Sequence, residues 1–416
     1  MKRKRIIVFG NLIASMILLF LVGCKAEEVD EKDSSSEKVK IEFFHYKSEA
    51  KDTFDELISK FEKENPNIDV VNANPPDAET VLKTRVAKRD IPDIVAIGAN
   101  STFAELSKAG VFVDVTNATE LDSIQPAYID MLRDVTGLEK VYAIPYAANA
   151  DGIIYNKTIF NELGLTVPKT WDELIAVAEK VKAAGKTPFY FTFKDAWTTL
   201  PVYNALAANT QGENFFDQLN DGKTTFQKGY KEATEKFVQL LEYGHKDNFG
   251  KGYADGNVAF AKGESAMYLQ GIWAIPEIRK ANPDIELGVF PYPATNDPEN
   301  TKLVSGVDLL LAISKTSKHP EEARKFVNFL LDLENAKFYL SEQNAFSAIK
   351  GITQEDPALD GLKESFEKGA LVDFPDHYIP LAVGLEKLLQ QLTHDKDVEK
   401  FLKNLDAEWE KVQGRK

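Results

Sequence analysis

The amino-acid sequence predicts an α/β fold built around a mostly parallel sheet. Segments with strand periodicity alternate along the chain with segments that have helix periodicity. Residues 92–98 are an apolar run that starts at Pro and ends at Gly, which is typical of a strand buried on both faces. The chain has 416 residues, 44% hydrophobic and 28% charged, so it can form more than one domain and wholesale disorder is excluded.

The first two predicted strands flank a helix. Residues 39–43 alternate polar and apolar side chains as a strand does, and residues 68–71 form the next strand. Between them, four apolar side chains recur at the spacing of one helix face: Phe54, Leu57, Ile58 and Phe61. Because proline interrupts helical hydrogen bonding, Pro66 is expected to end this helix.

Later elements continue the alternation. A second helix is predicted around residues 82–86, ahead of the 92–98 strand. Residues 188–193 are rich in aromatic side chains and predict a strand. Residues 381–412 predict helical structure.

The clearest helix start lies at Thr170. Thr170 and Glu173 have the spacing of a capping box, in which each side chain satisfies a backbone N–H. Gly185 is expected to end this helix. Trp171 and Trp409 lie on apolar helix faces and are expected in the hydrophobic core.

Composition excludes several kinds of site. Lys plus Arg is 50 and Asp plus Glu is 65, a net charge of −15, which is unsuited to binding nucleic acid phosphates. A single cysteine excludes an intrachain disulfide framework and a Cys-rich zinc site. The five histidines are dispersed without metal-ligand spacing, so we predict no metal and no cofactor.

Motifs for common enzyme chemistry are also missing. The sequence has no dinucleotide-binding glycine pattern, no phosphate loop ending in Gly-Lys-Ser/Thr, no His-Glu-x-x-His and no Gly-x-Ser-x-Gly. With 65 carboxylates, a pair of glycosidase type stays open as an alternative, but no particular pair is indicated.

The N-terminus predicts a secretory signal peptide over residues 1–23. A basic start, Lys2 to Arg5, precedes an apolar stretch and a small residue before Cys24. A retained membrane anchor is the alternative, although the apolar stretch is at the short end for a span of about 30 Å. Residues 24–38 are polar and acidic, without apolar periodicity, and predict a flexible tether.

Leu21-Val22-Gly23-Cys24 resembles the lipobox of bacterial lipoproteins, in which the cysteine becomes the lipidated first residue. The resemblance implies palmitate-type acylation of Cys24 and attachment to the outer face of the cell membrane, as in a Gram-positive bacterium. More than one acyl chain on one residue suits stable anchoring.

Three further segments resemble the extracellular sugar-binding lipoproteins of ABC importers. They are Tyr142-Ala143-Ile144-Pro145-Tyr146 with Ile154-Tyr155-Asn156-Lys157, the stretch from Leu163 to Leu174, and the stretch from Phe260 to Trp273. Their order along the chain, together with the lipobox, identifies the chain as a member of this family, in its maltose and multiple-sugar group and near its raffinose/melibiose branch.

That resemblance implies a two-lobe fold with a hinge and a ligand cleft between the lobes. Residues 39–147 plus 306–350 would form lobe 1, and residues 148–305 plus 351–416 lobe 2. It also implies a monomer without enzymatic activity that delivers an oligosaccharide to the transmembrane subunits of an ABC permease. The cleft would lie at the carboxyl ends of the strands, where open α/β folds bind ligands.

A neutral sugar needs flat aromatic side chains for its ring face and fixed polar groups for its hydroxyls. The resemblance puts Trp273 at the cleft, with a core tryptophan as the alternative. Trp197 follows a predicted strand, so it is a second stacking candidate. Lys47 and Glu49 follow the first strand and could hold hydroxyls, with a solvated helix N-terminus as the alternative, and Asn100 follows the 92–98 strand.

Three polar candidates lie at the inferred crossings between lobes: Asn149 and Asp151 at the first, and Asp308 at the second. Hydrogen bonding within the hinge is the alternative role for them. The last group lies in a loop held between two prolines, where Phe374 would stack while Asp376 and His377 bind hydroxyls. This loop resembles one that contacts the terminal galactose in the raffinose/melibiose branch, and a rigid surface loop is the alternative.

We therefore expect an extracellular binding lipoprotein for an oligosaccharide, with α-galactosides such as raffinose, melibiose and stachyose as the best match. The alternatives are another oligosaccharide on the same fold, such as a maltodextrin or an arabino-oligosaccharide, a secreted glycosidase, or a surface protein without a small ligand.

Overall fold

A computed structural model describes residues 38–414 of the chain. The predicted signal peptide, Cys24 and nearly all of the predicted tether lie outside the described residues. The strands are β1 (Val39–His45), β2 (Ile68–Ala73), β3 (Ile94–Ile97), β4 (Ile144–Asn156), β5 (Thr187–Tyr190), β6 (Ser265–Gly271), β7 (Leu287–Phe290), β8 (Leu303–Ile313), β9 (Phe346–Ser347) and β10 (Leu371–Val372).

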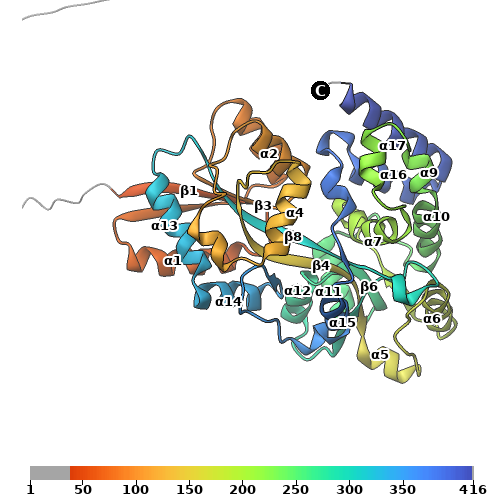
Figure 1. Cartoon of the computed structure of the whole chain (residues 1–416). Helices are drawn as coiled ribbons and strands as arrows, with labels where there is room; N and C mark the ends of the chain where they lie inside the picture. The colour runs from red at the N-terminus through yellow and green to blue at the C-terminus, as the bar shows by residue number, and fades with distance from the viewer. Residues whose placement is uncertain (1–37, 415–416) are drawn as a thin grey trace, which may run out of the picture. The chain divides into compact units, whose positions relative to one another are not determined.

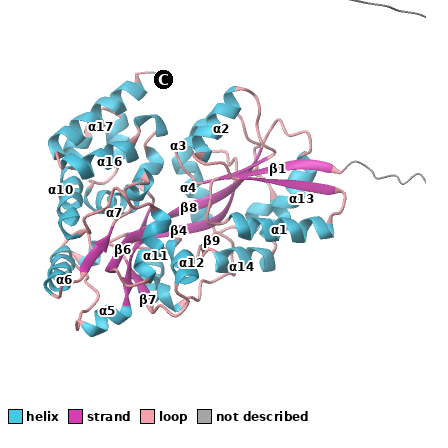
Figure 2. Cartoon of the chain, turned by 180° about the vertical axis from the view of Figure 1, so that it is seen from behind, coloured by secondary structure: helices cyan, strands magenta, loops and turns pink. Residues whose placement is uncertain are grey.

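Helices separate most of these strands along the chain, singly or in runs, and Figures 1 and 2 show where they lie. They are α1 (Lys51–Glu64), α2 (Ala78–Ala87), α3 (Ser101–Lys108), α4 (Pro126–Thr136), α5 (Lys157–Glu162), α6 (Trp171–Ala183), α7 (Leu200–Thr210), α8 (Phe215–Asn220), α9 (Phe226–Gly229), α10 (Lys231–Leu240), α11 (Tyr253–Ala261), α12 (Ala274–Ala281), α13 (Pro320–Leu331), α14 (Leu333–Glu342), α15 (Asp360–Lys368), α16 (Leu385–Asp395) and α17 (Val398–Gln413). Short 3-10 helices include η2 (Ala196–Thr199) and η6 (Pro375–Tyr378).

The sheet runs in the order β2-β1-β3-β8-β4-β6-β5, with β10 beside β8 and with β7 and β9 beside β4. The pairs β1–β2, β1–β3 and β5–β6 are parallel, as expected from strand–helix–strand units. The pairs β3–β8, β4–β8 and β4–β6 are antiparallel. The prediction of a mostly parallel sheet is therefore wrong. β4 and β8 run opposite to each other as the chain passes from one group of helices to the other and back.

These two long strands connect the two halves of the described chain. β4 is 13 residues long and β8 is 11, and in Figure 1 both extend from the helices around α1 and α13 towards those around α6 and α7. Their register pairs Ala148 with Val307 and Asn149 with Gly306. The residues predicted at the crossings thus lie within paired strands.

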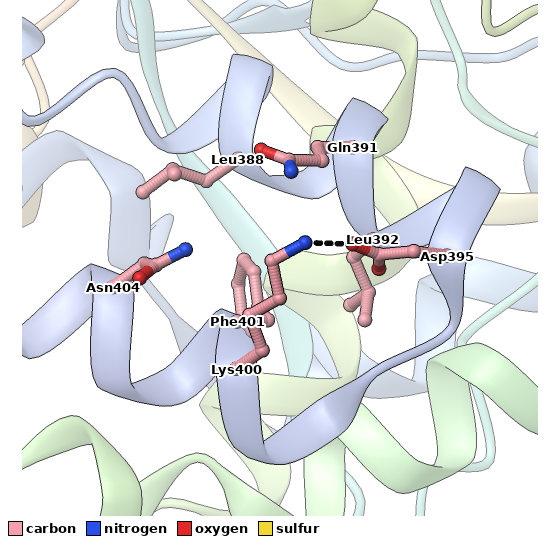
Figure 3. A pocket seen from close by; sticks show the side chains of 7 residues that line it. All are labelled: Leu388, Gln391, Leu392, Asp395, Lys400, Phe401 and Asn404. Carbon is pink, nitrogen blue, oxygen red and sulfur yellow. Dashed lines mark hydrogen bonds and ion pairs between the residues drawn. The ribbon is translucent and has the colours of Figure 1, made fainter.

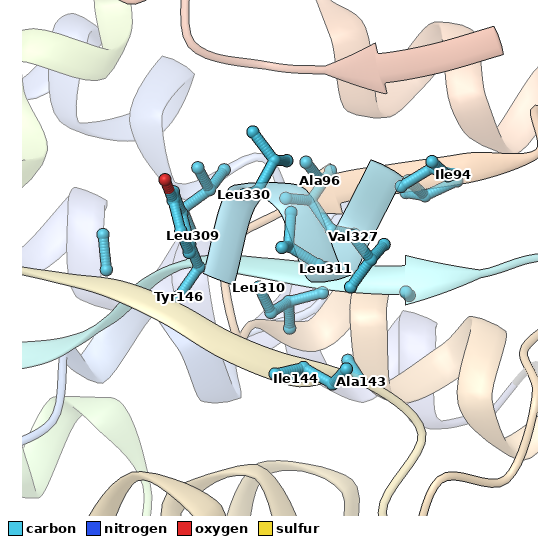
Figure 4. Close-up of a cluster of buried hydrophobic side chains, with 14 of the residues drawn as sticks. Ile94, Ala96, Ala143, Ile144, Tyr146, Leu309, Leu310, Leu311, Val327 and Leu330 are labelled. Atoms are coloured by element: carbon cyan, nitrogen blue, oxygen red, sulfur yellow. The ribbon is translucent and has the colours of Figure 1, made fainter. Parts of the chain in front are cut away.

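The hydrophobic core is divided on either side of that point. One buried cluster takes its residues from 41–148 and 307–349, and Figure 4 shows part of it, with Ile144 and Tyr146 of β4 beside Leu309 and Leu311 of β8. The other two buried clusters take theirs from 150–304 and from the C-terminal part, 358–412. Full burial of a Leu or Phe side chain contributes about 1.5–3 kcal/mol, so each cluster stabilises its own half.

Local predictions match these elements closely. Phe54, Leu57, Ile58 and Phe61 are all buried on one face of α1, which ends at Glu64, ahead of Pro66. Trp171 and Trp409 are buried, as expected for core residues. The predicted strand at 188–193 is shorter in the structure, because β5 ends at Tyr190 and the chain then turns into η2.

The cap at Thr170 differs in one detail from the predicted box. Thr170 Oγ1 accepts the Glu173 N–H at 3.3 Å, as predicted. The Glu173 carboxylate instead accepts the N–H of Lys169 at 2.7 Å. The Glu173 carboxylate therefore binds the N–H of Lys169, one residue before the N-cap, and not the N–H of Thr170 itself.

Candidate functional site

Asp308, in the middle of β8, accepts hydrogen bonds from three side chains that come from distant parts of the chain. The Lys47 ammonium lies 2.6 Å from Oδ2, and the Asn149 amide donates to the same oxygen at 2.7 Å. The Tyr46 hydroxyl lies 2.8 Å from Oδ1 and 2.7 Å from the backbone carbonyl of Asp308. The loop after β1 is therefore fixed to both long strands at one carboxylate.

Lys47 is buried, with 7% of the residue exposed, and Glu49 is its second partner at 3.3 Å. Burial by itself would lower the pKa of Lys47, but the carboxylates of Asp308 and Glu49 raise it above its ordinary value. Lys47 thus stays an ammonium and offers charge-assisted hydrogen bonds. A solvated helix N-terminus, the alternative for this segment, does not match this burial.

Asp151 is the most unusual group of the site. It is 1% exposed, and neither carboxylate oxygen has a hydrogen-bond partner among the described residues. Burial, followed by the charges of Asp376 and Asp308, raises the pKa of Asp151 well above its usual value. Asn149 Oδ1 is buried without a partner in the described residues as well. Leaving buried oxygens unsatisfied is costly, and no group of residues 38–414 donates a hydrogen bond to these atoms.

The loop between the prolines forms η6 and carries a compact polar cluster. Asp376 Oδ1 accepts from the Asn204 amide at 2.8 Å, which ties the loop to α7. His377 Nδ1 lies 3.0 Å from Asp373 Oδ1, and the Phe374 and His377 rings are 4.9 Å apart. Phe374 is buried in the core of its half, so its ring serves the loop's packing as well as any stacking role.

The charge on His377 follows from its neighbours. Burial would lower the pKa of His377, but Asp373, and behind it Asp376 and Asp308, raise it to about 9. His377 is therefore an imidazolium at neutral pH. Burial has the opposite effect on a carboxyl group, and it raises the pKa of Asp376.

The loop at 374–377 and the long strands interact electrostatically. Asp376 and Asp308 both act on the charge of Asp151, and Asp308 also acts on that of His377. These interactions place the loop at 374–377 within electrostatic reach of the β4–β8 crossing, although about 70 residues separate them in sequence.

Trp273 lies beside this polar group. It precedes α12, is partly buried, and has the Lys47 ammonium 6.0 Å from its ring centroid. The six-membered part of its ring lies close to Gly271, since a Cβ built there would come within 2.0 Å of Trp273 Cζ3. The Trp273 ring thus lies at the edge of the polar cluster, next to Lys47.

The other predicted residues differ in their surroundings. Trp197 is 36% exposed in η2 and packs against Tyr253 at 5.0 Å. Asn100 caps α3 by accepting from Thr102 and Phe103, and its amide donates to Glu79 at 2.6 Å. Both ends of the Asn100 side chain are thus already bonded within the protein.

Several residues of the cluster were not selected from the sequence: Tyr46, Asn204, Tyr253 and Asp373. Asp373 and His377 have the i, i+4 spacing that could have indicated a pair. Asn204 is a polar residue inside an otherwise apolar stretch of α7 and could have been noted for that reason. For Tyr46 and Tyr253 the sequence carries no such signal.

Two hollows on the surface lie elsewhere and contain none of the predicted site residues. One, of about 10 Å³, lies between α16 and α17 beside the Lys400–Asp395 ion pair, and Figure 3 shows its lining. The other, of about 430 Å³, lies over η1 (Thr119–Ser123) and the start of α4. Residues 38–414 include no helix long and apolar enough to cross a membrane. They also include no group of three or more His, Cys, Asp or Glu side chains that could hold a metal ion.

The chain is similar to known solute-binding proteins of bacteria. Residues 47–337 match the family model described as "Bacterial extracellular solute-binding protein". The "Multiple sugar-binding protein" of Streptococcus mutans is 36% identical over 363 residues, which are 85% of this chain and 84% of that protein. The "Melibiose/raffinose/stachyose-binding protein MelE" of Bacillus subtilis is 26% identical over 335 residues, 78% of this chain and 77% of that one.

Solved structures give the same result. The structure of RafE in complex with raffinose has a TM-score of 0.80 and 32% identity, and covers 89% of this chain and 99% of its own. The apo form of RafE from Streptococcus pneumoniae has a TM-score of 0.71 and 33% identity, and covers 90% of this chain and 98% of its own. With its two-lobe α/β fold, the chain belongs to the bacterial extracellular solute-binding proteins.

Proposed function

We propose that the protein captures an oligosaccharide outside the cell and delivers it to the transmembrane subunits of an ABC importer. The observation that carries the proposal is a set of buried oxygens, on Asp151 and Asn149, that accept no hydrogen bond from residues 38–414 and lie next to fixed charges and a tryptophan ring. Sugar hydroxyls supply the missing donors, and an aromatic ring suits the apolar face of a pyranose. The similarity to proteins named for binding several sugars supports it.

We further propose α-galactosides of the raffinose, melibiose and stachyose type as the ligands. Phe374, Asp376 and His377 lie in one loop, with an anionic and a cationic group side by side. Such a pair discriminates the position of a hydroxyl, because the wrong isomer leaves a buried polar group unpaired. The relatives named for raffinose and stachyose support this class.

The proposed binding cleft lies between two lobes, residues 39–147 plus 306–350 and residues 148–305 plus 351–416. The division of the buried clusters near Ala148 and Gly306 supports these boundaries. Lys47 and Glu49 approach from lobe 1, Trp273 and the 374–377 loop from lobe 2, and Asn149 and Asp308 lie on the connecting strands. In this proposal Trp197 and Asn100 complete the set of ligand contacts, Asn100 through the second N–H of its amide, because Glu79 takes only one of the two.

Calorimetric titration of purified protein with a sugar panel tests the proposal. Melibiose, raffinose and stachyose are expected to bind, while maltotriose and arabinotriose bind far more weakly. Tight binding of maltotriose or arabinotriose alone would reject the galactoside class but keep the sugar-binding function. Absence of heat with every sugar would reject both.

We propose that the protein carries out no covalent chemistry on its ligand. Raffinose recovered after long incubation with the protein is expected to be intact by chromatography. Stoichiometric or catalytic release of galactose or sucrose would show instead that the site is a glycosidase.

We also propose that Cys24 anchors the mature protein to the outer face of the membrane of a Gram-positive cell, where it acts as a monomer. The lipobox-like sequence at residues 21–24 supports this anchoring. Mass spectrometry of the mature protein is expected to show a diacylated Cys24, whereas a Cys24→Ala variant keeps its precursor mass. An unmodified Cys24 in the unaltered mature protein would contradict the anchor.

A further inference from the structure

Asp373 holds the 374–377 loop against β8, one of the two strands that connect the halves of the described chain. β10 pairs in parallel with β8, and its last residue, Val372, lies beside Val304. Asp373 follows directly, and a Cβ built on Gly306 would come within 2.2 Å of Asp373 Oδ1. Because Gly306 lies inside a strand and has no positive φ, it is the room for this carboxylate that requires glycine there.

The Asp373 carboxylate also binds the loop that follows it. Oδ1 accepts the backbone N–H of Phe374 at 2.8 Å and lies 3.0 Å from Nδ1 of His377. The side chains of Asp373 and His377 are 8% and 12% exposed. As an imidazolium, His377 carries a proton on both ring nitrogens. Asp373 takes the Nδ1 proton, and Nε2–H donates to no group of residues 38–414.

Acidic groups surround the pair of Asp373 and His377. Those that act on this pair or on Asp376 from the neighbouring elements are Asp134 of α4, Asp151 of β4, Tyr230 ahead of α10, Asp308 of β8, Tyr378 of η6 and Glu386 of α16. Apart from burial, Asp373 has the largest effect on the charge of His377. Contact and charge thus both assign His377 to Asp373.

We propose that Asp373 is a positioning residue that joins the connecting strand β8 to the recognition of the terminal sugar. Seated beside Gly306, its carboxylate takes Nδ1–H of His377 and leaves Nε2–H to donate to a sugar hydroxyl. Asp373 acts through His377 and not by touching the ligand, because it is buried and its Oδ1 is bonded twice. The inference rests on the proposed function, since the sugar is the partner of His377.

The pH dependence of raffinose affinity separates this role from a purely structural one. The unaltered protein is expected to change its affinity less than about twofold between pH 6.0 and 8.0, because the pKa of His377 is about 9. Asp373→Asn keeps an oxygen for Nδ1–H but loses the charge, so the pKa of His377 falls towards 6.5. Its raffinose affinity is expected to lie within about threefold of the unaltered value at pH 6.0 and to drop roughly tenfold by pH 8.0.

Gly306→Ala tests the connection to β8, because its methyl group would displace the Asp373 carboxylate. NMR titration of the His377 ring protons in the ligand-free protein is expected to show a lower pKa in Gly306→Ala, as in Asp373→Asn. The double variant should show little further decrease, since both changes act on the same contact.

Glu120→Gln is the matched control for the loss of a buried, paired carboxylate. The Glu120 side chain is 7% exposed and lies 2.6 Å from its cationic partner Arg324, away from the 374–377 loop. This variant should leave the His377 titration unchanged, and its raffinose affinity should show the same small pH dependence as that of the unaltered protein.

An unchanged His377 titration in both Asp373→Asn and Gly306→Ala would overturn the positioning role, whatever the sugar results. A lowered His377 pKa without a pH-dependent loss of raffinose affinity would overturn its link to sugar recognition. If the unaltered protein binds no sugar of the panel, the proposed function fails. The titration of the ligand-free protein still shows in that case whether Asp373 and Gly306 position His377.

Discussion

At the scale of single residues, the site combines charges that each depend on a neighbour. Lys47 stays charged because Asp308 and Glu49 offset the effect of its burial. His377 stays charged because of Asp373. Asp151 has no cation of its own, and burial favours its neutral form. Changing one of these side chains therefore changes the electrostatics of the others.

Replacing Asp376 tests whether the loop selects the terminal sugar. A hydrogen bond to a charged group is worth about 1.5–3 kcal/mol, so Asp376→Ala is expected to weaken raffinose binding roughly 10–150-fold. Trp273→Ala also weakens binding but leaves the preference for raffinose over a glucose-ended trisaccharide nearly unchanged, since a ring face reads shape more than hydroxyl position. Calorimetric titration of both variants with both trisaccharides measures this. Raffinose binding by Asp376→Ala at the unaltered affinity would remove the loop from the site.

The raised pKa of His377 predicts a stability that falls at alkaline pH. A pKa of about 9 in the folded protein, against 6.5 for free histidine, means that the folded state holds this proton more tightly. The stabilisation is complete below pH 6.5 and is lost as the pH rises through 9, which amounts to about 3 kcal/mol. Urea unfolding between pH 6.5 and 9.5 measures the loss. His377→Gln is expected to show a smaller decline, and an equal decline would exclude His377 as its source.

At the scale of elements, strand ends and turns position the functional side chains. The end of β1 delivers Tyr46 and Lys47, the end of β6 delivers Trp273, and the end of β5 leads into the turn with Trp197. Helix caps fulfil a second task, since Asn100 holds the start of α3 through both of its amide atoms. The strands therefore fix the backbone from which these site side chains project.

Gly271, the last residue of β6, is predicted to control the position of Trp273. In Gly271→Ala the new methyl group would collide with the indole, so the ring must move away from the backbone. Oligosaccharide affinity is expected to fall roughly three- to tenfold, the range of one lost stacking contact. Titration and near-UV circular dichroism of the tryptophans measure the two effects.

Gly212→Ala provides the control for that substitution. Gly212 follows α7, and nothing lies within 4 Å of a Cβ built on it. The oligosaccharide affinity of Gly212→Ala and its near-UV circular dichroism are both expected to equal those of the unaltered protein. Unaltered sugar binding in Gly271→Ala would mean that Trp273 is not part of the binding surface.

At the scale of the whole molecule, the proposed function requires the two lobes to move. A ligand that contacts both lobes and the connecting strands binds the closed form better, and this difference in affinity drives closure. The chain is more similar to RafE with raffinose than to apo RafE, with TM-scores of 0.80 and 0.71 at nearly equal identity.

Small-angle scattering measures that movement in solution. The radius of gyration is expected to decrease when raffinose saturates the protein, and to stay constant with a sugar that gives no heat in titration. A radius that is unchanged at saturation would contradict a hinged cleft, even if the sugar binds.

The sequence by itself determined the features that depend on neighbours in the chain. Helix α1 and its buried face follow from the spacing of Phe54, Leu57, Ile58 and Phe61. The start of α6 follows from Thr170, and the 374–377 loop from its two prolines. The resemblance to a known family led to two further predictions, namely the two crossings between the lobes and Trp273 as a site residue.

Only the tertiary structure decided what depends on contacts between distant residues. Asp308 lies 262 residues after Tyr46 and 159 after Asn149, and Asn204 lies 172 before Asp376, so no local pattern relates them. The direction of β4 and β8 relative to their neighbours was equally hidden, because side-chain alternation is the same in parallel and antiparallel strands. The contact between the Trp197 and Tyr253 rings likewise depends on Asp195, which accepts the Tyr253 N–H from 58 residues away in sequence.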